Sequence, residues 1–293
     1  MQIVNQCPIC VGTNIIPYSM KYQSGFPHIS RTKCIDCGIV FANPMATFDE
    51  LLVFYSHYYD KGNFGMLEYK QRVSKKINGI RLMDINDLQK QKSQVLQYKK
   101  KGSFLDVGFG LGEELAIFHQ LGFKVYGTEF DQDCLSFLNK IIPDAHLFYG
   151  DLISAHYPDA SFDVINVFHV IEHLINPIDY IIELKRIMKP GGIMIIGTPD
   201  ISSWAYRLFR LFNFALLSIP KIVDGLEHTV VFNKKTLRKL FKHYGFGILE
   251  HYSESLVESL TDIRSSNLTL GKKVARYLQT FVKINQVLIL RKL

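Results

Sequence analysis

The sequence has no long hydrophobic run, no internal repeat and no low-complexity tract. No apolar stretch reaches the ~18 residues of a membrane-spanning helix, and residues 1–5 lack the basic and apolar blocks of a secretory signal. Global disorder is excluded as well, because 47% of the residues are hydrophobic and 13% are aromatic. These features predict a cytoplasmic globular protein with reduced cysteines.

Positive charge is in modest excess, at +7 over 293 residues. Such a balance suits either an acidic partner or a solvated basic surface. The lysines are scattered over 99–101, 234–242 and 272–276 rather than gathered in one stripe, which disfavours a nucleic-acid partner.

Cysteine is scarce, but four of the five cysteines are paired by spacing as Cys7-x-x-Cys10 and Cys34-x-x-Cys37. Two such pairs joined by a loop supply the four thiolates of a tetrahedral zinc site. Because four thiolates leave no open position, the site is predicted to be structural. Unrelated free thiols and disulfides are the alternatives. Cys134 is predicted to be a core residue.

Three regions are predicted. Residues 1–46 form a small zinc-binding β unit that needs the metal because its own core is too small. Residues 47–101 form a helical arm and linker, beginning with a capping-box spacing of Thr47 and Glu50. From 102 to 293 strands and helices alternate, which predicts an α/β domain with a mostly parallel sheet covered on both faces.

The expected strands and helices follow from hydrophobic periodicity. The strands are 103–107, 124–128, 145–148, 162–167, 193–197, 246–252 and 286–291, and the helices are 112–121, 131–141, 177–188 and 234–244. The apolar stretch 201–227 is predicted to be a lid over a substrate pocket, with a membrane-surface helix as the alternative. Residues 253–283 are predicted to be a partly helical insertion.

The stretch with the clearest function is a glycine-rich turn after the first expected strand. Gly108, Gly110 and Gly112 alternate there, and Asp106 precedes them. Glycine permits positive φ and lets a ligand lie against the main chain, and the following helix directs free N–H groups at it. Glu129 ends the next expected strand and suits a ribose diol. The turn alone does not decide between a nucleoside and a dinucleotide as the ligand.

The chain from 102 to 293 resembles the class I S-adenosylmethionine-dependent methyltransferases. The matching pieces occur in that family's order: Leu105-Asp106-Val107-Gly108-x-Gly110-x-Gly112, Gly122-Phe123-x-Val125-x-Gly127-x-Glu129, Gly150-Asp151, Phe162-Asp163-Val164-Ile165, His169–Leu174, Leu184–Gly192 and Thr198-Pro199. The resemblance implies a Rossmann-like methyltransferase fold with a seven-stranded, mostly parallel sheet. Phe109 and Leu111 stand where the family has smaller residues, and they are expected to narrow the methionine pocket.

The N-terminal part resembles a bacterial subgroup in which two C-x-x-C pairs and a Tyr-rich helix precede the methyltransferase domain. Its members act in sugar, polysaccharide and secondary-metabolite pathways, and the sugar C-methyltransferases are the best understood. The chain ends after the seventh expected strand, without the additional C-terminal domain of those enzymes. This difference leaves open whether a carbon, an oxygen or a nitrogen is methylated.

The resemblance implies roles for the residues that match the family's motifs. Gly108, Gly110 and Gly112 admit the methionine end of the cofactor, Asp106 orients its amino group, Glu129 holds the ribose and Asp151 accepts from the adenine amine. His169 lies beside the cofactor, at the tip of the fourth strand.

The acceptor side is expected to be built from histidines, because their pKa lies near the working pH. The resemblance implies His228 as general base, Glu227 as its orienting partner, His173 farther toward the acceptor, and Tyr58 or Tyr59 as an acceptor contact. A metal site on His169, Glu172 and His173 is an alternative, but the H-E-x-x-H order is absent.

The predicted function is methyl transfer from S-adenosylmethionine to a small-molecule acceptor, with a hydroxyl or carbon of a nucleotide-linked sugar, glycan or natural-product precursor as the target. The alternatives are an RNA methyltransferase and a non-catalytic adaptor that binds the cofactor. No transmembrane segment is expected, weak contact with a membrane surface is allowed by 201–227, and the protein is expected to be a monomer or a homodimer.

Overall fold

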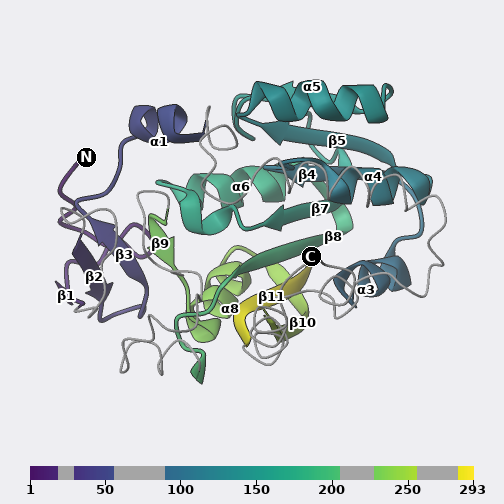
Figure 1. Cartoon of the computed structure of the whole chain (residues 1–293). Helices are drawn as coiled ribbons and strands as arrows, with labels where there is room; N and C mark the ends of the chain where they lie inside the picture. The colour runs from purple at the N-terminus through teal and green to yellow at the C-terminus, as the bar shows by residue number, and fades with distance from the viewer. Residues whose placement is uncertain (19–29, 56–89, 205–227, 256–282) are drawn as a thin grey trace, which may run out of the picture.

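The computed structural model of the chain describes residues 1–18, 30–55, 90–204, 228–255 and 283–293. Two β-sheets lie in these residues, a four-stranded sheet and a seven-stranded sheet. Figure 1 shows the small sheet and helix α1 (Phe48–Tyr55) at the end of the large sheet toward which its parallel strands point. Among the described residues, no helix is both long and apolar enough to span a membrane.

The large sheet is mostly parallel and has the order β10-β11-β8-β7-β4-β5-β6. Strands β4 to β8 run parallel to one another, whereas β11 is antiparallel to both β8 and β10. The strands are β4 (Ser103–Val107), β5 (Lys124–Glu129), β6 (His146–Tyr149), β7 (Phe162–Phe168), β8 (Met188–Pro199), β10 (Phe246–Ser255) and β11 (Lys283–Lys292). The predicted fold class and seven strands are therefore confirmed.

Helices cover both faces of this sheet. Successive residues of a strand point to opposite faces, so neighbouring residues pack under different helices. Phe104 belongs to the hydrophobic cluster under α3 (Lys90–Tyr98), α4 (Glu113–Gln120) and α5 (Gln132–Ile141). Its neighbour Leu105 belongs to the cluster under α6 (Pro177–Ile187) and α8 (Lys234–His243). Strands β4 and β7, in the centre of the sheet, are buried on both faces. Their continuous apolar sequences predicted this burial.

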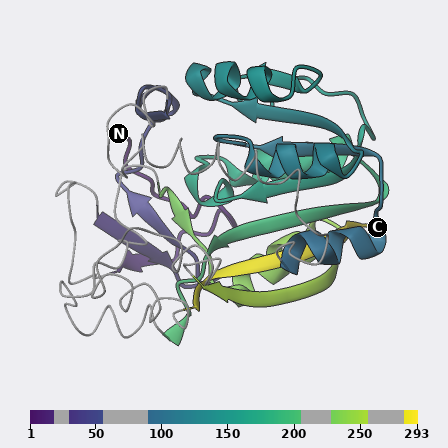
Figure 2. The same cartoon turned by 45° about the vertical axis from the view of Figure 1, so that its right-hand side comes forward.

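Helix α1 begins with the predicted capping box. The Thr47 backbone N–H donates to Glu50 Oε2 at 2.9 Å, and the Glu50 N–H donates to Thr47 Oγ1 at 3.4 Å. Each residue satisfies a backbone donor at the start of the helix. The helix therefore starts where the sequence predicts it, and Figure 2 shows it beyond the edge of the large sheet toward which the parallel strands point.

The small sheet is antiparallel and contains a strand from far along the chain. Its order is β1 (Ile15–Pro17), β2 (Ser30–Cys34), β3 (Val40–Asn43) and β9 (Val230–Val231). Its core is continuous with the large sheet, since Cys34, Ile39 and Phe41 share a hydrophobic cluster with Phe232 and Leu237. The first strands of the chain therefore pack as one body with the segment that follows His228.

Three details differ from the sequence-based expectations. Strand β8 starts at Met188, before the expected strand 193–197; over this extension its pairing with β7 is irregular and Gly191 has a φ of 68°. Residues 253–255, expected to open a helical insertion, continue strand β10. The rest of that insertion up to residue 282 and residues 205–227 of the predicted lid lie outside the described residues.

Candidate active site

The glycine turn joins the end of β4 to the start of α4 as predicted. Gly108, Gly110 and Gly112 have φ values of 67°, 55° and 75°, which side chains with a Cβ rarely adopt. The Gly108 N–H donates to the Thr128 carbonyl at 2.8 Å, so the turn is fastened to β5. A Cβ on Gly108 would also lie 2.8 Å from Val170 Cγ2. The turn therefore requires glycine and presents bare backbone at the sheet edge.

Phe109 and Leu111 lie between the glycines of the turn. Both are buried, and Phe109 packs so closely over Gly127 that a Cβ there would lie 2.5 Å from its ring. Both side chains belong to the hydrophobic cluster under α3, α4 and α5. That they narrow the methionine pocket stays a prediction.

Glu129, at the tip of β5, ties the glycine turn to the residues that follow β5. Its Oε2 accepts from the Gly110 N–H at 2.8 Å, and its Oε1 accepts from the Phe130 and Asp131 N–H groups at 2.7 and 3.2 Å. Burial raises the pKa of this carboxyl, although the three backbone donors oppose that rise. Within the described part of the chain, three of about four acceptor positions are thus used, which leaves one for a further donor.

Asp106 lies beneath the turn and is 3% exposed. Asn166, on the neighbouring strand β7, donates to Asp106 Oδ1 at 2.8 Å. Burial raises the pKa of this carboxyl well above its usual value, and the Asn166 bond opposes the shift only in part. No signal in the sequence points to Asn166, because its pairing with Asp106 depends on the alignment of two parallel strands.

Asp151 follows β6 and belongs to the same edge of the sheet. It accepts from the Ser154 N–H at 2.7 Å and from the Tyr180 hydroxyl at 3.1 Å. Tyr180 lies on α6, so Asp151 ties the loop after β6 to a helix beneath it.

Three histidines meet around one buried carboxylate at the end of β7. His169 Nδ1 lies 3.0 Å from Glu172 Oε1, and His173 Nε2 lies 4.0 Å from the same oxygen. His173 and His228 lie ring to ring with centroids 4.9 Å apart. Glu172 is fully buried, and among the described residues neither its Oε2 nor the buried Nδ1 of His228 has a hydrogen-bond partner. The structure thus brings His169, His173 and His228 together around Glu172.

The backbone at this cluster is unusual. His169 has a φ of 55°, in the left-handed region that few residues other than glycine adopt. Its N–H is held by the Gly197 carbonyl at 2.8 Å, so β8 fixes the bend at the end of β7. Strain of this kind concentrates at functional sites.

The cluster is electrostatically coupled. Burial alone would raise the pKa of Glu172, but the hydrogen bond from His169 and the charge of His173 lower it to about 2. Burial lowers the pKa of His228 to about 3, an effect opposed by Glu172. At neutral pH, Glu172 is therefore an anion and His228 is a neutral imidazole. From the sequence, Glu172 is expected only as an alternative metal ligand; its place beside His228 was not predicted, because that contact joins distant parts of the chain.

Helix α1 spans the two halves of the site. Phe48 makes an edge-to-face contact with Phe130, beside Glu129, at a centroid distance of 6.3 Å. Tyr55, at the other end of the helix, contacts the His173 ring edge-on at 5.8 Å. The sequence assigned an acceptor contact to Tyr58 or Tyr59 of this aromatic segment. Both lie outside the described residues, as does Glu227.

The four predicted zinc ligands form one cluster. The Sγ atoms of Cys7 and Cys37 lie 3.5 Å apart, as do those of Cys10 and Cys34, and all four lie within 4.8 Å of one another. Sulfurs bound to tetrahedral zinc at ~2.3 Å lie about 3.8 Å from one another, whereas a disulfide needs ~2.05 Å. The spacing of the four sulfurs fits a zinc site better than it fits disulfides. Cys134 is a buried core residue, as predicted.

The cluster of Glu172, His173 and His228 also contains three groups that could bind a metal, within 4.8 Å of one another. Nitrogen and oxygen ligands at ~2.0 Å from tetrahedral zinc lie about 3.3 Å apart. The 4.0 Å between Glu172 and His173 exceeds that value. These groups therefore match an acid–base cluster better than a metal site.

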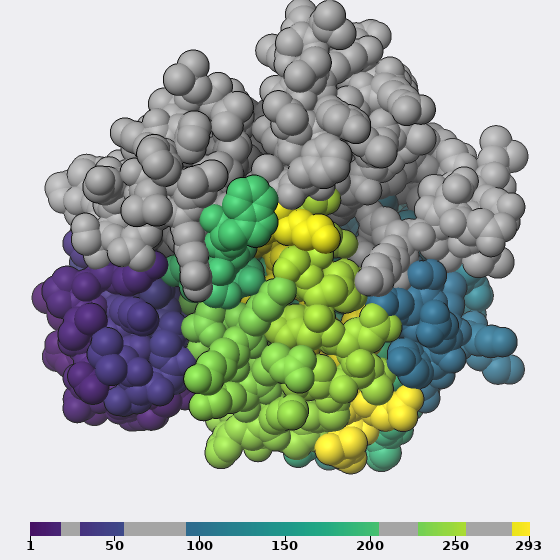
Figure 3. Space-filling model, turned by 90° about the horizontal axis from the view of Figure 1, so that it is seen from below, coloured from purple at the N-terminus to yellow at the C-terminus, as the bar shows by residue number. Residues whose placement is uncertain are grey.

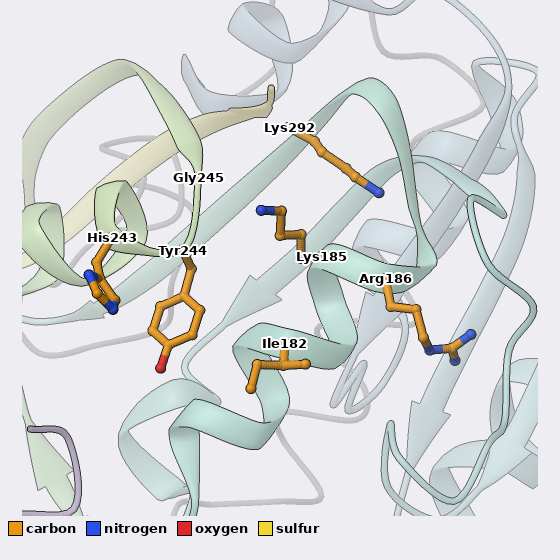
Figure 4. A pocket seen from close by; sticks show the side chains of 7 residues that line it. All are labelled: Ile182, Lys185, Arg186, His243, Tyr244, Gly245 and Lys292. Atoms are coloured by element: carbon orange, nitrogen blue, oxygen red, sulfur yellow. The ribbon is translucent and has the colours of Figure 1, made fainter. Parts of the chain in front are cut away.

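A hollow with many basic side chains lies elsewhere (Figure 4), lined by Ile182, Lys185, Arg186, His243, Tyr244, Gly245 and Lys292. Lys292 Nζ donates to the carbonyl of Met188, the first residue of β8, so this hollow lies at the opposite edge from the glycine turn. Arg186 is already paired with Glu183 and Asp159. We do not assign the hollow to the active site.

The sequence between residues 83 and 251, more than half of the chain, matches the methyltransferase domain family, and the chain belongs to this family. It is 30% identical over 96 residues to a probable S-adenosylmethionine-dependent methyltransferase of Mycolicibacterium smegmatis, covering 33% of this chain and 37% of that protein. It is 29% identical over 161 residues to a ubiquinone biosynthesis O-methyltransferase of Glaesserella parasuis, covering 52% and 65%. The chain thus spans between about a third and two-thirds of the length of these curated relatives.

Solved structures show the same fold at low sequence identity. An S-adenosylmethionine-dependent methyltransferase from Mesorhizobium loti matches with a TM-score of 0.50 and 14% identity, over 71% of this chain and all of that one. A chain of the complex between the Haloferax volcanii Trm112 methyltransferase activator and the putative methyltransferase matches with a TM-score of 0.52 and 14% identity, over 84% and 99%.

Proposed function

We propose that this chain transfers a methyl group from S-adenosylmethionine to a hydroxyl or carbon of a small-molecule acceptor. The observation that carries the proposal is the family match over residues 83–251, which includes a positive-φ glycine turn fastened to Glu129. We infer a nucleotide-linked sugar, glycan or natural-product precursor as the acceptor class, on the resemblance of the four-cysteine unit and aromatic helix to enzymes of those pathways.

The residues of the glycine turn fit the cofactor. Gly108, Gly110 and Gly112 admit the methionine end against bare backbone, and the backbone N–H groups at the start of α4 suit its carboxylate. The open acceptor position of Glu129 suits a ribose hydroxyl. Asp106, held by Asn166, supports the turn from below and orients the amino group, and Asp151 accepts from the adenine amine.

When bound, S-adenosylmethionine supplies an electrophilic methyl group on a sulfonium. This chain then has to align the acceptor and take its proton. His228 is the proposed base, because its neutral imidazole is able to accept that proton. The anionic Glu172 stabilises the resulting imidazolium, since its charge raises the pKa of His228. Glu227 is proposed as a second orienting carboxylate.

The remaining side chains define the acceptor side. His169 lies nearest to the β7 end and is 43% exposed, so it is proposed to lie beside the cofactor. His173 contacts Tyr55, so this histidine and the aromatic helix that continues to Tyr58 and Tyr59 are proposed to contact the acceptor. A zinc ion held by Cys7, Cys10, Cys34 and Cys37 is proposed to stabilise the small sheet.

The names of two relatives favour a second acceptor class. A ubiquinone biosynthesis O-methyltransferase and a demethylmenaquinone methyltransferase match 52% and 57% of this chain. A ring hydroxyl or carbon of a quinone precursor is therefore the second candidate acceptor.

The test is to incubate the purified full chain with methyl-labelled S-adenosylmethionine and separate panels of nucleotide sugars, phenolic quinone precursors and RNA. The proposal predicts label in one small-molecule panel, and label in nucleotide sugars supports the acceptor class we infer. Label only in RNA would replace the proposal with an RNA methyltransferase. Cofactor binding without transfer to any panel would identify a non-catalytic adaptor.

A further inference from the structure

A buried arginine joins the small sheet to the proposed base. Arg31, on β2, is 5% exposed, and its Nη1 donates to the backbone carbonyl of His228 at 2.5 Å. Burying a guanidinium is costly unless it is bonded. Arg31 therefore has a fixed partner at a residue 197 positions away in the sequence.

The segment after His228 is fixed to the same small sheet. The Ala42 N–H donates to the Thr229 carbonyl at 2.8 Å, and Phe41 pairs with Val230 in the strand pair β3–β9. Figure 3 shows the N-terminal residues in purple directly against the green residues of this later segment. The chain leaves His228 along a path set by β3.

The Cys34–Gly38 turn holds the next stretch. Thr236 Oγ1 donates to the Cys37 carbonyl at 2.5 Å, and Asn233 Nδ2 donates to the Gly38 carbonyl at 3.0 Å. Asn233 is also the N-cap of α8, where it accepts from the Thr236 N–H. Two of the four proposed zinc ligands, Cys34 and Cys37, thus lie in the turn that fixes the start of α8.

On its other side, the segment is fastened to the histidine cluster. Thr229 Oγ1 lies 2.6 Å from the Leu174 carbonyl and 3.1 Å from the Glu172 carbonyl. His228 therefore lies between two anchors, Arg31 on the small sheet and the turn that carries Glu172. A shift of the small sheet would move the imidazole relative to Glu172.

We propose that Arg31 is a positioning residue for His228, and that the four-cysteine unit is through it a structural part of the acceptor site. The inference rests on the proposed function, in which His228 is the base. Arginine suits this task because its planar fork keeps a fixed geometry that a lysine ammonium does not. Arg31 has a second effect on His228, since its positive charge lowers the pKa of the imidazole.

The first test measures the histidine itself and needs no acceptor. In the zinc-loaded full chain, the imidazole of His228 is titrated by NMR, and amide exchange is followed at residues 229–231. Arg31→Met should speed exchange at these amides by roughly 10- to 100-fold, because a hydrogen bond to a charged group is lost. It should also shift the His228 titration to higher pH, with the zinc content unchanged.

Two variants keep this test decisive. Arg31→Lys retains the charge without the fork, so it should leave the titration near that of the wild type but only partly restore the exchange protection. Lys33→Met removes a cation two residues along β2 and should change neither. Wild-type exchange and titration in Arg31→Met would overturn the proposal. If Arg31→Met does not fold, wild-type exchange in Arg31→Lys would overturn it.

A second test applies once an acceptor is found. Arg31→Met should lower kcat by roughly 10- to 100-fold with little change in the affinity for S-adenosylhomocysteine. If Arg31 acts through His228, Arg31→Met should add little further loss in a His228→Gln background, because the two changes damage one unit. Independent, multiplicative losses would contradict the positioning role. An inactive wild type would instead contradict the proposed function and leave the NMR result standing.

Discussion

Replacing Cys34 with serine tests the four-cysteine unit most sharply. Cys34 is fully buried, and its Sγ lies 3.5 Å from that of Cys10. Its backbone also closes the turn, since the Cys34 N–H donates to the Ile39 carbonyl and its carbonyl accepts from the Gly38 N–H. Serine keeps those backbone bonds and removes only the sulfur, so the variant isolates the proposed metal ligand.

The expected magnitude follows from the number of ligands. Structural zinc sites of this type contribute about 10–16 kcal/mol in binding free energy at neutral pH. Shared among four thiolates, this is about 3 kcal/mol for each ligand. Cys34→Ser should therefore weaken zinc binding by a factor on the order of 100.

The assay measures zinc by mass spectrometry before and after challenge with a chelator, together with thermal unfolding. The wild type should hold one equivalent through the challenge, and Cys34→Ser should lose its zinc and unfold at a lower temperature. Cys134→Ser is the matched control, because Cys134 is equally buried but lies on α5, outside the cluster. Less than half an equivalent in freshly purified wild type would refute the zinc site, as would a Cys34→Ser variant that retains zinc like the control.

Three further predictions concern Glu129 on the cofactor side of the site and His228 on the acceptor side. Glu129→Ala should weaken S-adenosylhomocysteine binding by about 10- to 100-fold, because a charge-assisted hydrogen bond is lost. Calorimetry measures this affinity, with Asp144→Ala at an exposed position as the control. An unchanged affinity would remove Glu129 from the site. His228→Ala should abolish methyl transfer but leave that affinity nearly intact, so a near-normal rate would eliminate His228 as the base. The third concerns pH. Since the pKa of His228 is lowered from 6.5 to about 3 in the folded chain, the unfolded chain binds more protons between these values and stability falls as pH falls. Urea unfolding at pH 7 and pH 5 should show a loss of about 2 kcal/mol from this group, and His228→Gln should remove that part; an unchanged slope would contradict the buried, neutral imidazole.

Local sequence signals predicted the large sheet and the glycine turn. Apolar runs such as 103–107 and 124–128 are fully or mostly buried strands, and their order left only a parallel arrangement with helices on both faces. Alternating glycines can be recognised because the positive φ at Gly108, Gly110 and Gly112 requires them. Each C-x-x-C pair is also a local sequence signal, and the four cysteines form one cluster in the structure.

Contacts between distant residues left no such signal. Strand β9 is only two residues long, so neither its length nor its pattern separates it from a loop. Glu172 was read as part of a motif, but its full burial among three histidines depends on how residue 228 returns to the end of β7. The bond from Arg31 to the His228 carbonyl has the same origin, since backbone acceptors carry no sequence signature.

The most direct measurement for the central claim is calorimetry of the intact chain with S-adenosylhomocysteine and, separately, with a nicotinamide dinucleotide. A sheet edge built from the glycine turn and Glu129 should give saturable, one-to-one heat with the sulfur nucleoside and none with the dinucleotide. Heat with the dinucleotide alone would contradict the assignment of this edge to a methyl donor.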